Sequence, residues 1–205
     1  MHNSHGYNIL TVGVGGTGVI SATQILAWAA LEDNYQVRTA ETHGMAQRGG
    51  SVVGYLRFGS NVKGPLIYKA DVILSFELSE ILRYSEYINE KTSLFVSKDI
   101  LIPPSVYTYN IPYPSQDVIL NHLRKITHHV HLIDAGKMAK NAGNPKTSNV
   151  VLIGTIYGAG KLPIQESSLK NAIIKFVPDR AKKINEIAFQ IGIQYGRKIK
   201  EGFYE

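Results

Sequence analysis

The chain of 205 residues contains no cysteine. This absence excludes disulfide bonds, thiolate-bound iron–sulfur clusters and cysteine zinc sites within the chain itself. The sequence also lacks any apolar run of the roughly 20 residues that a membrane-spanning helix needs, so we expect no membrane segment. Its first residues, MHNSH, do not combine a basic region with an apolar one, as a secretory signal does. We therefore expect a cytoplasmic protein.

Charged residues are sparse as well, at 19% of the chain, whereas hydrophobic residues make up 44%. That balance is typical of a folded protein, and the length suffices for one domain with a buried core. The 22 Lys and Arg residues exceed the 16 Asp and Glu residues, which gives a formal net charge of +6. The densest basic groups, at 180–183 and 197–200, lie in a late helical stretch. We interpret them as a solvated helix face and expect no nucleic-acid partner.

Apolar runs alternate with helix-like stretches, which predicts an α/β, Rossmann-like fold with a mainly parallel sheet flanked by helices. We expect strands over residues 8–12, 35–40, 51–58, 71–76, 93–97 and 130–133, with an edge strand over 106–111. Helices are expected over 16–33, 77–89, 116–127, 149–160, 169–176 and 178–200. We expect residues 1–205 to form a single domain, in which a helical part from about 136 to 205 completes a sheet-forming body of about 1–135.

The segment after the first expected strand, Gly13-Val14-Gly15-Gly16-Thr17-Gly18, matches the pattern G-x-G-x-x-G. In a Rossmann-like fold the first glycine permits a tight turn, the second lets the backbone approach a phosphate, and the third allows close packing of helix on strand. The free N–H groups and the positive dipole end at the start of the following helix favour an anion. We therefore predict that Gly13, Gly15, Gly16, Thr17 and Gly18 form a binding site for an anionic group.

The sequence leaves the ligand of this turn open, because a dinucleotide, another diphosphate or a carboxylate would each fit. A tight turn without a ligand is a further alternative. Glu41, at the end of the second expected strand, is placed for a ribose hydroxyl, as in nicotinamide-binding enzymes. Arg38 could instead face a phosphate. These features keep two other functions open: a free-standing NAD(P)-binding oxidoreductase, and a ligand-free scaffold that only assembles partners.

A second glycine-containing motif follows the second expected strand and reads ETHGMAQRGGS at residues 41–51. Arg48 offers a planar, permanently charged donor, Gly49 and Gly50 let backbone N–H groups approach an anion, and Ser51 adds a hydroxyl. His43 can donate or accept a hydrogen bond. We predict that this motif faces a partner's active site, with Arg48 and His43 in supporting roles, or holds part of a cofactor. A structural turn that locks a subunit interface is the alternative.

Three histidines, His128, His129 and His131, gather near the start of an expected strand. They lack the further ligands that a metal needs, so we expect exposed histidines and no metal site. Glu77 directly follows another expected strand. We predict that it either caps the next helix or points into the ligand cleft.

The helix expected at 16–33 is apolar around nearly its whole circumference. A helix of this kind is buried on more than one side. The sequence therefore predicts either a further layer that covers the helix or a subunit contact through Ile25 or Trp28.

The two motifs, in this order, resemble those of the beta subunit of indolepyruvate:ferredoxin oxidoreductase, which corresponds to the gamma subunit or domain of other 2-oxoacid:ferredoxin oxidoreductases. The matching segments are GVGGTGV at 13–19, ETHGMAQRGGSV at 41–52, the small-residue stretch at 149–158, and NEIAF at 185–189 with Gly192. The run HGMAQRGGS is specific to the indolepyruvate branch, whereas pyruvate and oxoglutarate relatives share mainly its RGG end. Thr17 departs from the family, in which many members carry glutamine.

The resemblance implies a gamma-type domain that pairs with a larger alpha subunit. In the family this partner carries thiamine diphosphate with magnesium and [4Fe-4S] clusters, and the complex oxidises an aryl 2-oxoacid, passing the acyl group to coenzyme A and electrons to ferredoxin. The present chain has no cysteine for a cluster and no Gly-Asp-Gly segment for a magnesium–thiamine diphosphate site. We therefore expect a non-redox subunit, inactive by itself, with coenzyme A as a candidate ligand of the glycine turn.

Overall fold

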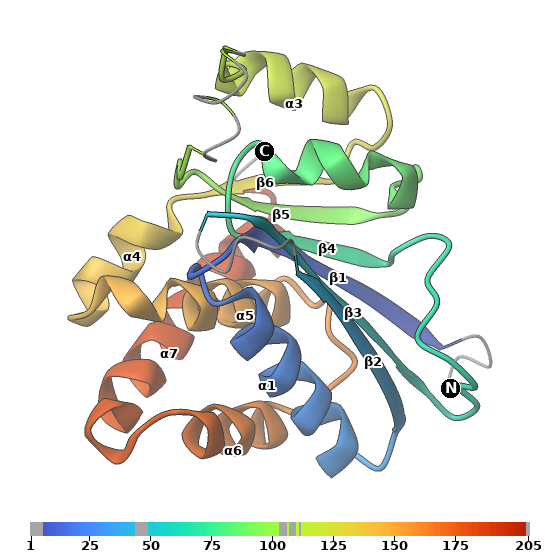
Figure 1. The fold of residues 1–205 in the computed structure, drawn as a ribbon. Coiled ribbons are helices and arrows are strands. Elements are labelled where there is room, and N and C mark those ends of the chain that lie inside the picture. The colour runs from blue at the N-terminus through green and yellow to red at the C-terminus, as the bar shows by residue number, and fades with distance from the viewer. Residues whose placement is uncertain (1–5, 44–48, 103–105, 107–109, 111, 204–205) are drawn as a thin grey trace.

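The computed structural model describes residues 6–43, 49–102, 106, 110 and 112–203. Within these residues a six-stranded sheet has the order β2-β3-β1-β4-β5-β6. Its strands are β1 (Tyr7–Val14), β2 (Gln36–His43), β3 (Ser51–Gly59), β4 (Val72–Ser75), β5 (Ser93–Ser97) and β6 (Val130–Ile133). The sheet runs through the middle of the molecule, with helices on both of its faces (Figure 1).

All strands except β3 point in the same direction. β1, β4, β5 and β6 pair in parallel, whereas β3 pairs antiparallel with both β1 and β2. The expectation of a mainly parallel α/β sheet is thus confirmed. Because β3 is inserted between β1 and β2, however, the ends of the first two strands are separated by a whole strand.

The central strands are buried on both faces. β4 reads VILS and β5 reads SLFVS, and every residue in both strands is buried. Short apolar runs of this kind are typical of parallel strands that are covered by helices on both sides. β2, by contrast, forms one edge of the sheet, and most of its residues are exposed.

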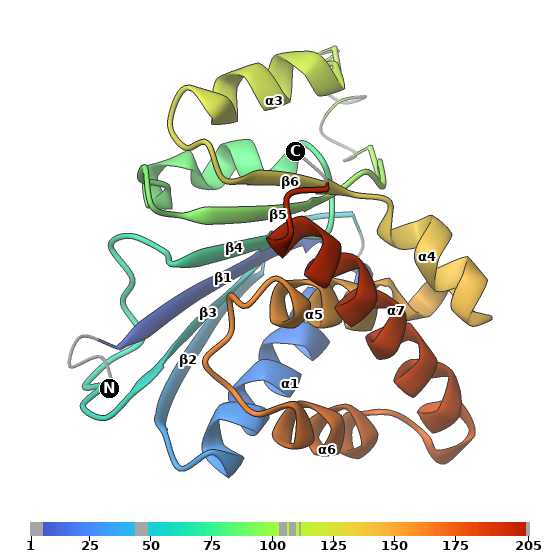
Figure 2. The same ribbon diagram turned by 180° about the vertical axis from the view of Figure 1, so that it is seen from behind.

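The helices form two unequal layers (Figures 1 and 2). One face of the sheet carries α1 (Val19–Glu32), α4 (Ala135–Ala142), α5 (Ser148–Gly158), α6 (Glu166–Phe176) and α7 (Lys182–Lys200), with the short 3-10 turns η2 (Pro145–Thr147) and η3 (Asp179–Ala181). The other face carries the 3-10 segment η1 (Glu80–Tyr87) and α3 (Gln116–Arg124). The larger hydrophobic core joins the sheet to α1, α5, α6 and α7, and a smaller core lies under η1 and α3.

Helices α5 and α7 approach each other closely because glycines face each other where they cross. α5 contributes Gly154 and Gly158, and α7 contributes Gly192 and Gly196. A Cβ atom added to any of the four would collide with a backbone carbonyl oxygen of the opposite helix. The buried small-residue helix expected near 149–160 is therefore confirmed as α5, and its small residues allow the contact with α7.

The prediction of a helix over residues 77–89 is wrong. Residues Glu80–Tyr87 form 3-10 turns instead, and these are interrupted at Tyr84, whose φ and ψ are −115° and 20°. The side chain of Glu77 accepts hydrogen bonds from the N–H groups of Ser79 and Glu80, at 2.8 and 3.0 Å, which holds the chain in a local turn. Side-chain bonds of this kind compete with the regular helical pattern. The other expected helices and strands are present, β5 and β6 with the expected bounds and the rest with shifted ends, except that most of 106–111 lies outside the described residues.

The apolar helix α1 is covered within the chain itself. Ile25 is only 1% exposed, so the prediction of a subunit contact through this residue is wrong. Trp28 packs edge-on against Phe176 of α6, and the Lys175 ammonium lies 3.3 Å from the centre of the Trp28 ring. Helix α6 is therefore the covering layer. None of the helices in the described ranges combines the length and hydropathy of a membrane span.

Candidate functional site

The order of the strands creates a switch point between β1 and β4. The chain leaves β1 through α1 toward β2 on one side of the sheet, whereas it leaves β4 through η1 toward β5 on the other side. β1 and β4 are parallel neighbours, and Val12 is aligned with Ser75. In open α/β sheets, ligands bind outside the carboxyl ends of the strands at such a point. The glycine turn after β1 and the Glu77 turn after β4 both lie there.

The glycine turn adopts a conformation that its sequence permits. Gly16 and Gly18 have φ angles of 99° and 90°, a region that other residues rarely occupy. Thr17 closes the turn, since its N–H and its hydroxyl both donate to the carbonyl of Val14, at 3.1 and 2.8 Å. A Cβ atom on Gly13 would lie 2.9 Å from Val19 and 3.0 Å from Phe76. Gly13 therefore allows α1 to pack closely on the strand ends, a role that the fingerprint assigns to its third glycine, whereas a Cβ atom on Gly18 would lie 3.1 Å from the Asn149 side chain.

The start of α1 has the properties of an anion site. The first hydrogen bond of the helix runs from the Ala22 N–H to the Gly18 carbonyl, at 3.0 Å, so the N–H groups of residues 19–21 precede the helical pattern. Within the described part of the chain no side-chain hydrogen bond caps this end, and the first turn contains no acidic residue. A Cβ atom on Gly16 would meet nothing within 4 Å among the described atoms. The turn thus presents open backbone and uncapped N–H groups, which suit a phosphate.

The structure brings the second motif to the first. The Gly15 N–H donates to the Gly50 carbonyl at 2.8 Å, and Val14 is aligned with Ser51 at the start of β3. The hydroxyls of Ser51 and Tyr84 share a hydrogen bond of 3.0 Å, which ties β3 to η1. Burial raises the pKa of Tyr84, so its hydroxyl stays protonated at neutral pH. Gly49, Gly50 and Ser51 therefore lie beside the glycine turn.

For two of the predicted residues of this motif, Arg48 and His43, the structure describes no side chain. Arg48 lies outside the described residues, and for His43 only the backbone, at the end of β2, is described. Their predicted supporting roles stay predictions.

The residues considered for nicotinamide selection are not brought to the glycine turn. Glu41 is aligned through β3 with Thr11, so it lies two strands across and three residues back from Val14. At about 4.8 Å per strand and 3.3 Å per residue, this offset is on the order of 14 Å. Arg38 is aligned with Asn8, roughly 20 Å back along the strands. This geometry does not support the ribose contact or the phosphate contact considered for these two residues.

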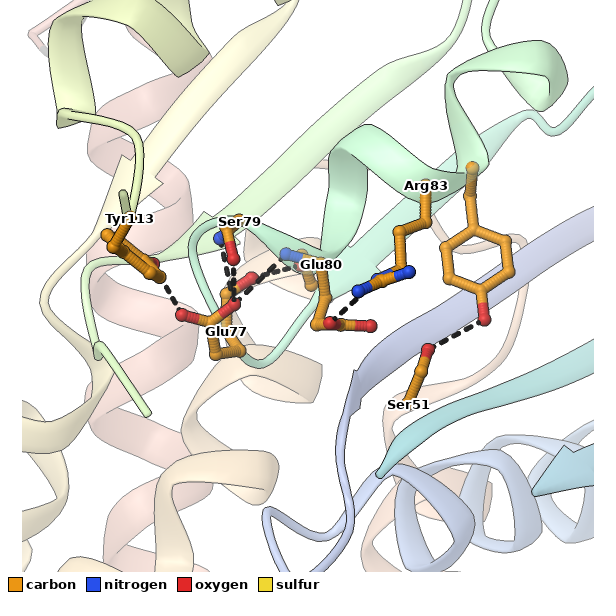
Figure 3. A network of polar contacts seen from close by, with 8 residues as sticks. Ser51, Glu77, Ser79, Glu80, Arg83 and Tyr113 are labelled. Atoms are coloured by element: carbon orange, nitrogen blue, oxygen red, sulfur yellow. Dashed lines mark hydrogen bonds and ion pairs between the residues drawn. The ribbon is translucent and has the colours of Figure 1, made fainter. Parts of the chain in front are cut away.

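The buried carboxylate of Glu77 organises the turn after β4 (Figure 3). Its Oε2 accepts hydrogen bonds from the N–H and the hydroxyl of Ser79 and from the N–H of Glu80, while its Oε1 accepts a bond of 2.5 Å from the hydroxyl of Tyr113. Burial, together with the bond to Glu77, raises the pKa of Tyr113. Of the two roles predicted for Glu77, the structure shows the capping one.

A second acidic group, Glu80, lies beside Glu77 and was not predicted from the sequence. This side chain is almost fully buried, and its Oε1 accepts a bond of 3.1 Å from Nε of Arg83. The Arg83 side chain is 56% exposed. Neither residue belongs to a recognisable motif, and the only available signal was their position just after a strand end.

The histidines form no metal site. Among the described residues, no group of three or more His, Cys, Asp or Glu side chains could hold a metal ion. His128 and His129 are exposed. His131 is half-buried against Phe95, with ring centres 5.0 Å apart, and burial with the nearby Lys161 charge lowers its pKa to about 4. The expectation that all three are exposed is therefore wrong for His131, which is neutral at physiological pH.

Comparison with known proteins shows the family. The model for "Pyruvate ferredoxin/flavodoxin oxidoreductase" matches residues 8–195. The indolepyruvate oxidoreductase subunit IorB of Thermococcus kodakarensis is 39% identical over 200 residues, which cover 94% of this chain and 97% of the relative.

Solved structures share the fold. The gamma subunit of a keto/oxoacid ferredoxin oxidoreductase from Geobacter sulfurreducens superposes with a TM-score of 0.67 at 20% identity, covering 93% of this chain and 98% of that one. A 2-oxoglutarate:ferredoxin oxidoreductase from Magnetococcus marinus, solved with 2-oxoglutarate, coenzyme A and succinyl-CoA bound, gives a TM-score of 0.70 at 19% identity. That match covers 95% of this chain but 32% of the larger one. With the sequence matches above, the conclusion is that the chain belongs to the pyruvate ferredoxin/flavodoxin oxidoreductase family, among the indolepyruvate oxidoreductase IorB subunits.

Proposed function

We propose that this chain is the non-redox subunit of a thiamine-dependent 2-oxoacid:ferredoxin oxidoreductase that acts on an aryl pyruvate such as indolepyruvate. The observation that carries this proposal is the sequence match with IorB subunits over nearly the whole chain. The chain contains no cysteine, so its own residues cannot form a cysteine-bound cluster. The redox chemistry must then come from a partner, a larger alpha subunit with [4Fe-4S] clusters that passes electrons to ferredoxin. Thiamine diphosphate with magnesium in that subunit supplies the decarboxylation chemistry.

The glycine turn is our candidate site for coenzyme A, the acyl acceptor of this reaction. Its diphosphate suits the start of α1, where the backbone beside Gly16 is open, and we propose that Gly15, Gly16, Thr17 and Gly18 form the turn that holds it. Gly50 is bonded directly to this turn. We propose that Gly49, Gly50 and Ser51 line the same site, with Arg48 and His43 in support. Gly13 contributes by letting α1 pack onto the strand ends.

Reconstitution tests the subunit role. We expect the chain to co-purify with a large, brown, cysteine-rich protein from its native host. We also expect the assembled complex to reduce ferredoxin with indolepyruvate and coenzyme A, and the isolated chain to show no such activity. Oxidation of an arylpyruvate by the purified chain alone would contradict the proposal.

Two further measurements separate this function from its alternatives. Calorimetry with NADH and NADPH on the purified chain should show no micromolar binding, and tight binding would favour a free-standing NAD(P) enzyme. In the assembled complex, Arg48→Ala should raise the KM for coenzyme A or lower turnover. Unchanged values for both would leave the ETHGMAQRGGS motif with only a structural role.

A further inference from the structure

Glu80 has an oxygen that the described part of the chain leaves without a partner. The residue is 1% exposed, and its Oε2 accepts no hydrogen bond from any described group, whereas Oε1 is bonded to Arg83. A buried carboxylate oxygen without a donor is costly, and such atoms in native proteins call for an explanation. By comparison, both oxygens of Glu77 are bonded. Among the described residues, this oxygen of Glu80 is therefore a hydrogen-bond acceptor that still lacks a donor.

Arg83 combines a fixed position with unused donors. Its Nε donates to Oε1 of Glu80 at 3.1 Å, no other hydrogen bond of its guanidinium is found among residues 6–43, 49–102 and 112–203, and its side chain is 56% exposed. A guanidinium has five N–H donors in a rigid plane, a geometry that matches phosphate and carboxylate oxygens. The bond to a buried carboxylate limits how this plane can turn. Arg83 is therefore an exposed cation whose direction is set by the protein interior.

Glu80 and Arg83 lie close to the switch point between β1 and β4. η1 contacts both β1 and β4. Tyr84, next to Arg83, shares a hydrogen bond with Ser51, whose neighbour Gly50 accepts the bond from Gly15. Figure 3 shows the Glu80 carboxylate and the Arg83 guanidinium between the Glu77 turn and Ser51. Three bonded segments thus place the pair on the same edge as the glycine turn.

We propose that Arg83 is a binding residue of the ligand site at this edge, and that Glu80 both positions Arg83 and accepts a hydrogen bond from the ligand through its free oxygen. The ligand class that meets both groups is a diphosphate ester that carries hydroxyl or amide donors next to its phosphates. A bare polyanion would meet the Glu80 charge without offering it a donor. The inference rests on the proposed function, because it assigns two further residues to the same site, and it makes the site selective for esters over inorganic diphosphate.

The experiment measures binding of two probes, coenzyme A and inorganic pyrophosphate, to the full chain by calorimetry. Arg83→Gln should weaken both about 10- to 100-fold, the range expected for losing a hydrogen bond to a charged group. Glu80→Gln should change the two in opposite directions: coenzyme A weakens about tenfold, and pyrophosphate tightens several-fold because a nearby like charge is gone. Arg124→Gln is the matched control, because this exposed arginine is the last residue of α3 and precedes β6, the edge strand at the opposite end of the sheet from β2.

Each outcome is decisive. Arg83 is exposed, so its glutamine and lysine variants should fold, and Arg83→Lys tests the guanidinium geometry even if Glu80→Gln is too unstable to assay. The proposal is overturned if Arg83→Gln matches Arg124→Gln, if Glu80→Gln shifts both probes in the same direction, or if the wild-type chain binds neither probe. None of these results bears on the subunit role, which is tested separately by co-purification and reconstituted activity.

Discussion

Replacing Gly192 with alanine should destabilise the protein through the contact between α5 and α7. The new Cβ atom would collide with the carbonyl oxygen of Val151, and it would lie 2.9 Å from the Thr155 nitrogen and 3.0 Å from Cα of Gly154. All three neighbours are backbone atoms of α5, which cannot rotate away as a side chain can. The helices must therefore separate by about 1 Å to restore an ordinary contact distance near 3.5 Å.

Two opposing effects set the size of the change. Alanine is favoured over glycine inside a helix by about 1 kcal/mol. Overpacking a close contact costs typically 1–3 kcal/mol and occasionally more, and here the contact lies within the larger core. Because the neighbours are backbone, we take the upper end of that range, which leaves a net loss of about 2 kcal/mol. For a domain of this size, that corresponds to a fall in Tm of about 4–8 °C.

Thermal unfolding followed by circular dichroism measures this change. Gly64→Ala is the control, because a Cβ atom there meets nothing within 4 Å and the residue has no positive φ. The control should leave Tm unchanged or slightly raised. A Gly192→Ala protein with unchanged or higher Tm would refute the reasoning, since helix propensity would then outweigh the contact. Gly154→Ala should behave alike, and the double variant should cost less than the sum, because one separation of the helices relieves both clashes.

Three further predictions follow from other parts of the structure. Glu77→Gln should lower the free energy of unfolding by about 2–3 kcal/mol in a urea titration, because an amide cannot accept all four bonds that the carboxylate accepts; an effect no larger than that of Tyr113→Phe would contradict this. The pKa of His131 is near 6.5 when the protein is unfolded but about 4 when it is folded, so the unfolded state takes up the proton first. The free energy of unfolding should therefore fall as the pH drops from 6.5 toward 4, by about 1 kcal/mol after allowance for the partial exposure of His131. His131→Asn should flatten this slope, and an unaltered slope would exclude the histidine as its source. A fragment of residues 1–135 should not unfold cooperatively, because the larger core includes residues of α5, α6 and α7; a sharp transition in differential scanning calorimetry would show that the sheet-forming body folds alone.

Local sequence patterns were sufficient for most of the fold. β4, β5 and β6 are short apolar runs, and β5 and β6 have the predicted bounds because few other structures suit such runs. The glycine turn was predictable because the positive φ angles of Gly16 and Gly18 leave little choice of residue. Position 77 shows the limit of this approach. The Glu77 side chain accepts hydrogen bonds from the N–H groups two and three residues later and so replaces the expected helix with a turn. The hydrophobic periodicity of the sequence does not indicate such a bond.

The sequence by itself determined which chemistry the chain lacks, where the glycine turn lies and that the fold is α/β, since composition and local spacing decide these properties. Only the tertiary structure decided that β3 lies between β1 and β2, which removes Glu41 and Arg38 from the glycine turn. It also decided that Gly50 bonds to Gly15 and that Glu80 and Arg83 stand at the same edge. These relations join residues tens of positions apart, and their energy comes from strand pairing and burial of the whole domain. No local pattern records them, because each exists only once the sheet has formed.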